Sequence, residues 1–419
     1  MTTRRQFMQS LSAAGAITAI ASTDTRLVAA SAGGPRFAPW TPGTLDIHHI
    51  STGRGNSTFC LSPDGTSIMI DAGAIYSPLK YTISPKPDGW RRPGEWIARY
   101  VARHMKPVGR KELNYFLPTH FHSDHIGEAS DETPLSADGS YRVTGIMEVA
   151  QTVPIRKIID RGHPRYDYPK VDRSPDALNY VAFVRSQAAR GVKVERFVPG
   201  SNRQVQLLFD PSSYPGFSVR NLAANGAVWT GSGEDSKQQF PPIATLHPNA
   251  YPTENMCSLA LRMDYGKFKY FTAGDMEGDT LYGKAAWRDI ETVTGQAAGR
   301  VDVAVATHHG FVNAMQPGIV RALRPRTWII FGWHATHPVI STLDNMLSRE
   351  LYPEERDVYS TALKEENKIV TRKLERLKSD NGHIVVRVAP GGESYRIVIL
   401  DNSDESDTVL MEHGPFSCG

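Results

Sequence analysis

Short runs of apolar and β-branched residues, separated by turn signals, dominate the first part of the chain. Three of these runs lie at 44–50 (TLDIHHI), 56–62 (NSTFCLS) and 66–73 (TSIMIDAG), with a Pro-Asp-Gly turn signal before the third. Runs of this kind are typical of consecutive antiparallel strands. A proline-rich loop is expected over 76–93, followed by an apolar stripe with helical spacing at 96–105.

The same two periodicities recur along the rest of the chain. Further strands are predicted at 113–118, 155–160, 243–247, 256–275 (a hairpin around Gly266), 301–307, 326–332, 383–389 and 394–400. Further helices are predicted at 177–191 and at about 279–294, 313–323, 341–350 and 363–377. Strand groups occur in both halves and no linker rich in Gly, Ser or Pro divides them. The pattern therefore favours one α/β sandwich of two sheets covered by helices.

The N-terminus follows a different pattern, MTTRRQFMQSLSAAGAITAIA. Paired Arg4 and Arg5 before a weakly apolar stretch are typical of a twin-arginine export signal. Small residues at 30–32 suit cleavage, so we expect a signal peptide over 1–32 and a bacterial protein that is periplasmic or secreted. The stretch is too short and interrupted for a stable membrane span, and the mature chain has no run of about 20 apolar residues.

The net charge and the cysteine content limit the kinds of partner and of structural cross-link that the sequence predicts. The 419-residue chain has a formal net charge of +3, and much of it lies in the expected signal peptide. A charge near zero does not indicate a general nucleic-acid binder, although a local basic patch stays open. Cys60, Cys257 and Cys418 give no disulfide framework, and no Cys/His spacing for a structural zinc is present. The sequence gives no indication of the oligomeric state.

The stretch THFHSDHIG, at the end of the apolar run 113–118, concentrates metal-binding side chains. In an extended segment His120 and His122 project to the same side, where they can bind one metal through imidazole nitrogens. Asp124 and His125 begin the next turn and face a second position. Imidazole with carboxylate suits zinc, with manganese and iron as alternatives. A run of surface histidines on a loop is the plain alternative.

The pattern HxHxDH after a strand resembles the signature of the metallo-β-lactamase superfamily. Other stretches resemble its ComEC-type (competence-protein-like) subfamily, and they occur in the expected order: HHISTGRGNSTFCLSPDGTSIMIDAG, ENMCSLALRMDYGKFKYFTAGD, VDVAVATHHG, GWHATHPVISTL and NGHIVVRVAPGG. The resemblance covers a domain over residues 44–401 and leaves 402–419 as a C-terminal tail. It implies an α/β fold, a four-layer αββα sandwich of two mixed β-sheets.

The resemblance also implies two divalent metal ions, expected to be zinc. His120 and His122 would bind the first metal, and Asp124 and His125 the second. Asp275 would bridge both, since one carboxylate can span two cations. For Asp275 the plain alternative is a cap of a following helix.

Histidines outside the first motif complete this assignment. Either His308 or His309 would bind the second metal; position in the Thr-His-His-Gly element favours His309, with His308 as a neighbour that faces the substrate. Many superfamily members supply a third histidine to the first metal just before the Asn-containing strand. Here the nearest is His247, eight residues before Asn255, and His163 is a weaker candidate.

Such a site would make a metal-bound hydroxide, because two cations bring the pKa of bound water down towards ~7. Asp124 would hold one metal and orient the hydroxide, which attacks phosphorus or a carbonyl carbon. His337, at the subfamily's later histidine position, would hydrogen-bond a substrate oxyanion; a polar loop residue is the alternative. No Gly-x-Ser-x-Gly elbow and no phosphate-cradling loop is present.

Three functions remain open. The resemblance favours a metallo-hydrolase of phosphodiesters, either small molecules or polymers, nucleic acid among them. The second is a hydrolase of lactams or lactones, against which the missing histidine counts. The third is a non-catalytic binding protein on the same fold, against which the intact set of ligands counts.

Overall fold

The computed structural model describes residues 26–27, 34–77, 80–170, 173–280 and 283–419. Nearly all of the expected signal peptide, 1–32, lies outside the described residues. The helices are α1 (Pro93–Met105), α2 (Ser123–Ile126), α3 (Ile146–Thr152), α4 (Pro175–Ala189), α5 (Ile290–Ala298), α6 (Pro317–Leu323), α7 (Ile340–Leu347) and α8 (Glu365–Val370). None of these described helices is long and apolar enough to cross a membrane.

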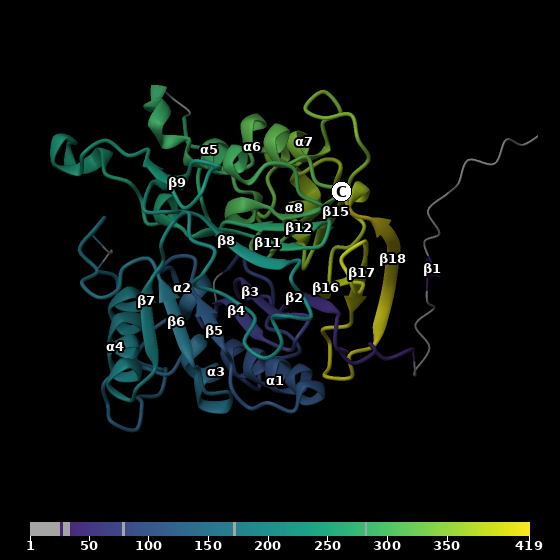
Figure 1. Ribbon diagram of the computed structural model, residues 1–419, viewed down its shortest axis with the longest axis horizontal. Coiled ribbons are helices and arrows are strands. Elements are labelled where there is room, and N and C mark those ends of the chain that lie inside the picture. The colour runs from purple at the N-terminus through teal and green to yellow at the C-terminus, as the bar shows by residue number, and fades with distance from the viewer. Residues whose placement is uncertain (1–25, 28–33, 78–79, 171–172, 281–282) are drawn as a thin grey trace, which may run out of the picture.

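Two mixed sheets form the centre of the molecule (Figure 1). The ten-stranded sheet has the order β1 (Arg26–Leu27), β18 (Val409–Ser417), β17 (Ser394–Leu400), β16 (His383–Val388), β2 (Leu45–His49), β3 (Ser57–Leu61), β4 (Ser67–Ala72), β5 (Tyr115–Leu117), β6 (Lys157–Asp160), β7 (Lys193–Arg196). The eight-stranded sheet has the order β10 (Ser236–Gln238), β9 (Ala227–Trp229), β8 (Phe217–Ala224), β11 (Ala260–Tyr265), β12 (Phe268–Thr272), β13 (Val303–Val305), β14 (Thr327–Ile330), β15 (Asp357–Ser360). Strands β4 to β7 and β12 to β15 run parallel, and the other pairs are antiparallel.

Apolar side chains fill the spaces between the layers. In β5, Tyr115 and Leu117 pack between the two sheets, whereas Phe116 packs towards α1, α3 and α4. In β14, Ile329 faces the other sheet and Trp328 faces α5, α6 and α7. Successive side chains of a strand point to opposite faces of its sheet. Each sheet therefore buries apolar side chains on both faces, which explains the near-continuous apolar runs in the sequence. The predicted four-layer αββα sandwich of two mixed sheets is confirmed.

Three predicted elements differ from the structure. The predicted strand 243–247 is a 3-10 turn (Ile243–Thr245), flanked by prolines that cannot donate to a sheet. The helix predicted from 279 begins only at Ile290, where the Asp289 side chain caps it by accepting from the Thr292 N–H. The helix predicted to end near 377 stops after Val370.

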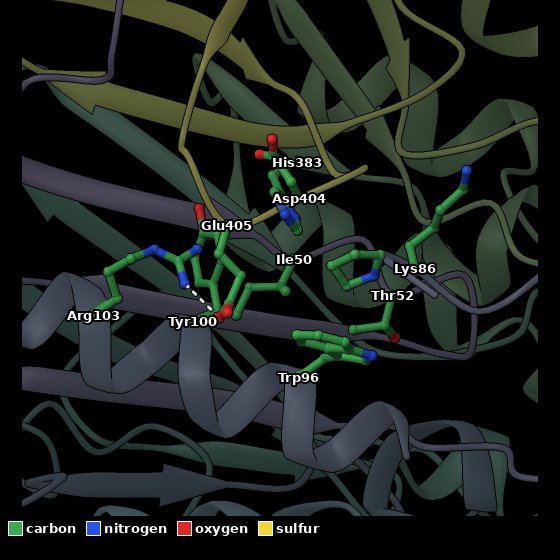
Figure 2. A pocket seen from close by; sticks show the side chains of 10 residues that line it. Ile50, Thr52, Lys86, Trp96, Tyr100, Arg103, His383, Asp404 and Glu405 are labelled. Carbon is green, nitrogen blue, oxygen red and sulfur yellow. Dashed lines mark hydrogen bonds and ion pairs between the residues drawn. The ribbon is translucent and has the colours of Figure 1, made fainter. Parts of the chain in front are cut away.

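The residues expected as a C-terminal tail, 402–419, are an integral part of the fold. Strand β18 pairs with β17 along the sheet. The preceding loop packs on α1, where Arg103 contacts both Glu405 and Asp407. Figure 2 shows Glu405 reaching Arg103 beside a small pocket. The predicted end of the domain at 401 is therefore too early, because β18, which follows a polar loop, pairs with β17 in the ten-stranded sheet.

Asp407 should make a measurable contribution to stability. It accepts from Arg103 through both carboxylate oxygens (2.8 and 2.9 Å) and lies 3.3 Å from His104 Nε2. Burial alone would raise the Asp407 pKa, but its bonds to His104 and Arg103 outweigh burial and lower it. We expect Asp407→Asn to reduce the free energy of unfolding at pH 7 by about 1–3 kcal/mol, measured by urea denaturation.

The difference between wild type and Asp407→Asn should shrink as the pH falls below the ordinary Asp range. A carboxylate with a lowered pKa stabilises the fold while ionised and loses that contribution on protonation. Glu405→Gln is the matched control: its carboxylate also pairs with arginine but is more exposed, so a smaller loss is expected. Equal losses for both variants at all pH values would contradict the assignment.

Candidate metal centre

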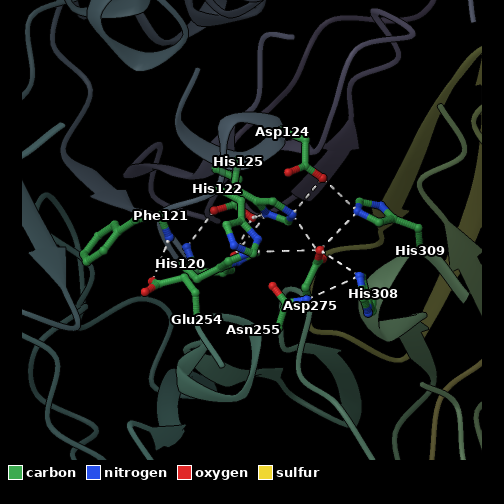
Figure 3. Close-up of polar contacts among 12 residues, drawn as sticks. His120, Phe121, His122, Asp124, His125, Glu254, Asn255, Asp275, His308 and His309 are labelled. Atoms are coloured by element: carbon green, nitrogen blue, oxygen red, sulfur yellow. Dashed lines mark hydrogen bonds and ion pairs between the residues drawn. The ribbon is translucent and has the colours of Figure 1, made fainter. Parts of the chain in front are cut away.

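The ends of three strands from the two sheets carry the site (Figure 3). After β5 come His120 to His125, of which the last three residues enter the short helix α2. Asp275 follows β12, and His309 lies in the turn after β13. Sites in layered α/β folds are commonly built at the carboxyl ends of strands, where loops from different strands converge.

Four of the predicted ligands form a compact, buried group. Asp124, His125, Asp275 and His309 each offer one ligand atom, and these atoms all lie within 4.8 Å of one another. His309 Nε2 lies 3.0 Å from Asp124 Oδ2 and 3.2 Å from Asp275 Oδ2. His125 Nε2 lies 3.0 Å from Asp275 Oδ1. Two imidazoles with two carboxylates are a donor set that suits a divalent metal ion.

The tautomers of the two histidines fit a metal. Nδ1 of His125 donates to Asp71 Oδ2 (2.8 Å), and Nδ1 of His309 donates to the Phe331 carbonyl (3.2 Å). Both rings therefore direct Nε2 to the group. His125 Nε2 and Asp275 Oδ1 are buried and have no well-aligned hydrogen-bond partner in the described part of the chain. Metal ligands typically show this pattern, in which the second ring nitrogen is fixed by a carboxylate or carbonyl.

Asp71 is a site residue to which sequence analysis gave no role. Besides holding His125, its carboxylate accepts from the backbone N–H of Thr119 (2.6 Å) and from the Thr119 hydroxyl (2.9 Å). Two residues later, a Cβ at Gly73 would lie 1.8 Å from the Asp124 carbonyl oxygen, so only glycine fits. The Asp-x-Gly at the end of β4 was the signal that could have identified this support.

His120 and His122 form a second, looser group. His120 Nε2 lies 3.0 Å from His122 Nδ1 and 3.9 Å from Asp275 Oδ2. His120 is buried, whereas His122 is partly exposed. Figure 3 shows Asp275 between these two histidines and His309. The structure thus places the Asp275 carboxylate next to both predicted groups of ligands.

His308 and His337 border the compact group. His308 Nδ1 donates to Asn313 Oδ1 (2.7 Å), and its Nε2 lies 3.7 Å from Asp275 Oδ2. The ring of His337 stacks on His309, with centroids 4.3 Å apart, and is buried. His309 rather than His308 therefore belongs to the compact group.

Neither candidate for a third histidine at the first metal is brought to the site. His247 is exposed, and its Nδ1 accepts from the backbone N–H of Asn249. The side chain of His163 packs edge-on against Tyr166. Among the described residues, no contact links either imidazole to His120 or His122.

The electrostatics of the group favour a cation. Burial would raise the pKa of Asp275, but His125, His309 and His308 outweigh it and hold that pKa well below its ordinary value. Burial would lower the pKa of His125, but Asp275, Asp124 and Asp71 hold it well above its ordinary value. The pKa of His309 rises to about 9, because Asp275 and Asp124 outweigh its burial. Without a metal, protons on imidazoles offset the carboxylates.

No protein-family model and no curated protein matches the sequence. Among solved structures, the chain is similar to a point mutant of the CmlA β-hydroxylase (TM-score 0.39, 12% identity), with 77% of this chain and 53% of that chain covered. It is also similar to a metallo-β-lactamase from Cronobacter sakazakii, a mutant in its HARLDQ motif (TM-score 0.31, 13% identity, 62% and 75% covered). A third is a diphosphatase from the PhnP family (TM-score 0.29, 11% identity, 68% and 85% covered). The chain spans about half the length of the hydroxylase.

Metal binding to the metal-free protein should release protons. Because Asp275 and Asp124 raise the pKa of both His125 and His309, a metal that takes both Nε2 atoms should displace about two protons at pH 7. Titration calorimetry in two buffers of different ionisation enthalpy measures this number. The His309→Gln variant should release about one proton fewer. Heats that do not depend on the buffer would contradict the assignment.

Proposed function

We propose that the protein is a metal-dependent hydrolase that cleaves phosphodiesters at a dinuclear site. The observation that carries this proposal is the position of Asp275 between two groups of ligands. One is the compact group with Asp124, His125 and His309, and the other is the pair His120 and His122. A single carboxylate placed between a pair of imidazoles and a mixed group of imidazole and carboxylate donors suits a bridging role between two cations.

His120 and His122 would hold the first metal, and Asp124, His125 and His309 the second, with Asp275 shared. Zinc is the expected metal, with manganese and iron as alternatives, because imidazole and carboxylate ligands suit all three. When bound, such metals supply a nucleophile from water at neutral pH and neutralise the charge that develops in the transition state.

The remaining side chains would orient the reactants. Asp124 Oδ2 lies 3.0 Å from His309 Nε2, so its other oxygen is available to orient the attacking water. Burial lowers the pKa of His308, whose Nδ1–H is held by Asn313, so a neutral ring presents Nε2 towards Asp275 and the substrate. His337 stacks on His309 and has a buried Nδ1 without a partner in the described residues; from this position beside the group it would hydrogen-bond a substrate oxyanion.

Phosphodiesters are favoured over lactams and lactones on two grounds. The sequence stretches resemble the ComEC-type subfamily, and neither His247 nor His163 contacts His120 or His122, beside which a β-lactamase is expected to hold a third histidine. A non-catalytic binding role is less well supported, because the structure brings the predicted ligands together. The near-neutral charge favours a small or cell-envelope diester over nucleic acid.

The proposal includes export by the twin-arginine route to the periplasm or beyond. It depends on Arg4, Arg5 and the small residues at 30–32, which lie outside the described residues. Folding before export would allow a metal to be acquired inside the cell.

The mature protein, loaded with zinc or manganese, should hydrolyse a bis-aryl phosphodiester. Asp275→Ala and Asp124→Ala should each lower kcat by on the order of 1000-fold or more, because each removes a ligand of the group that activates water. Release of the aryl alcohol, followed by absorbance, measures the rate. Circular dichroism should show that both variants remain folded.

Asp131→Ala is the matched control, since this aspartate is fully exposed and pairs with Arg142 at the surface. It should keep wild-type activity. Near-wild-type turnover in both site variants would refute the two-metal mechanism. Hydrolysis of a β-lactam or lactone without diester cleavage would contradict the proposed substrate class but would agree with the proposed metal centre.

A further inference from the structure

A buried ion pair lies directly behind the first pair of histidines. Arg161, at the end of β6, has a fully buried side chain, and Glu254, before β11, is 6% exposed. The arginine binds the carboxylate with two donors, Nε to Oε1 at 2.7 Å and Nη2 to Oε2. Burying two charges costs free energy that their attraction often fails to recover. Stability alone is therefore a weak explanation for this buried ion pair, and a role at the neighbouring site is considered.

Glu254 and Arg161 both contact Phe121, the residue between His120 and His122. Glu254 Oε1 accepts from the Phe121 backbone N–H at 3.1 Å, and Figure 3 shows this contact. The Arg161 guanidinium lies 4.9 Å from the centre of the Phe121 ring. Tyr180 stacks on the same ring with centroids 4.9 Å apart. We call Phe121, Arg161, Tyr180 and Glu254 the Phe121 clamp. It fixes both the backbone and the side chain of the residue that separates the two histidines.

The clamp also ties the two sheets together beside the site. Arg161 Nη1 donates to Asn225 Oδ1 (3.1 Å), and Asn225 Nδ2 donates back to the Arg161 carbonyl (2.8 Å). Asn225 lies in the turn between β8 and β9 of the eight-stranded sheet, whereas β6 belongs to the ten-stranded sheet. Next to Glu254, Asn255 Nδ2 lies 3.3 Å from His308 Nε2. The clamp thus joins the first motif to the facing half of the site.

We infer that Glu254, held by Arg161, is a positioning residue for the first metal. By fixing the Phe121 amide it aims His120 and His122 as a pair, and it thereby offsets the absence of a third histidine at that metal. Glu254 does this without ligation, because both of its carboxylate oxygens are already bound within the clamp. The inference rests on the proposed dinuclear site.

The two metals should depend on the clamp to different degrees. The compact group has its own supports, Asp71 behind His125 and the Phe331 carbonyl behind His309. The pair His120 and His122 has a weaker support of this kind, a 3.2 Å contact from His120 Nδ1 to the hydroxyl of the adjacent Thr119. Loss of the clamp should therefore weaken the first metal and spare the second. A purely structural ion pair would affect both metals through general loss of stability.

Two double variants separate positioning from stability. Arg161→Met with Glu254→Gln removes both charges but keeps an amide oxygen that can accept from the Phe121 N–H. Arg161→Met with Glu254→Leu removes both charges and the acceptor. We expect the glutamine variant to bind two metal ions per chain, and the leucine variant to bind the first metal about 10–100-fold more weakly, as for other supports behind metal ligands.

Elemental analysis measures the number of zinc ions bound per chain. Competition with a chromophoric chelator measures the affinity of each of the two sites. Cobalt substitution adds a spectroscopic readout, since only the absorption of the first site should change in the leucine variant. Glu254→Asp is a further test that keeps the charge balance but shortens the side chain by one carbon; it should also weaken the first metal selectively.

The control is an ion pair between β2 and β16 of the ten-stranded sheet, in which the buried Asp46 meets the partly exposed Arg387 (2.6 Å). Asp46→Asn with Arg387→Met should lower the unfolding temperature and leave both metals bound. Unchanged affinities for both metals in the leucine and Glu254→Asp variants would overturn the inference while the dinuclear proposal stands. A wild-type protein that takes up only one metal would overturn the dinuclear proposal itself.

Discussion

The buried carboxylates of Asp124 and Asp275 set the main electrostatic constraint on this structure. Both side chains are almost fully removed from water, and each contacts the Nε2 atoms of His125 and His309. Two negative charges in such a place are costly unless cations lie between or beside them. Protons on His125 and His309 meet this demand in the metal-free protein. A divalent metal would meet it with a more localised charge.

Both sheets contribute side chains that surround these two carboxylates. The ten-stranded sheet supplies the first motif and Asp71, while the eight-stranded sheet supplies Asp275 and His309. Neither sheet carries a complete set of donors, so the site exists only when the sheets face each other correctly. The apolar core between the sheets fixes that arrangement. Contacts such as Arg161 with Asn225 then refine it locally at the rim of the site.

Sequence reasoning recovered the fold class and named side chains that the structure brings together, because both depend on local signals. Strand and helix periodicities lie within short windows, and four of the predicted ligands lie within six consecutive residues. The supports behind the ligands were not recovered, because they depend on contacts between distant segments. Glu254 meets Phe121 across 133 positions of the chain. The final strand, β18, was missed for a related reason: a polar loop precedes it, and pairing with β17 rather than its own pattern defines it.

The asymmetry between the two groups of ligands bears on how the site would be tuned. Four donor residues within 4.8 Å, with both imidazoles held from behind by hydrogen bonds, describe a preorganised position. The pair His120 and His122 is looser, with His120 buried and His122 partly exposed. A position with fewer protein ligands leaves more of the coordination sphere to water or substrate, as open catalytic metal sites do. Under the proposed function, a rigid second position beside an open first one would let a substrate complete the first position. The lack of a third histidine near His120 and His122 among the described residues would then keep that position open.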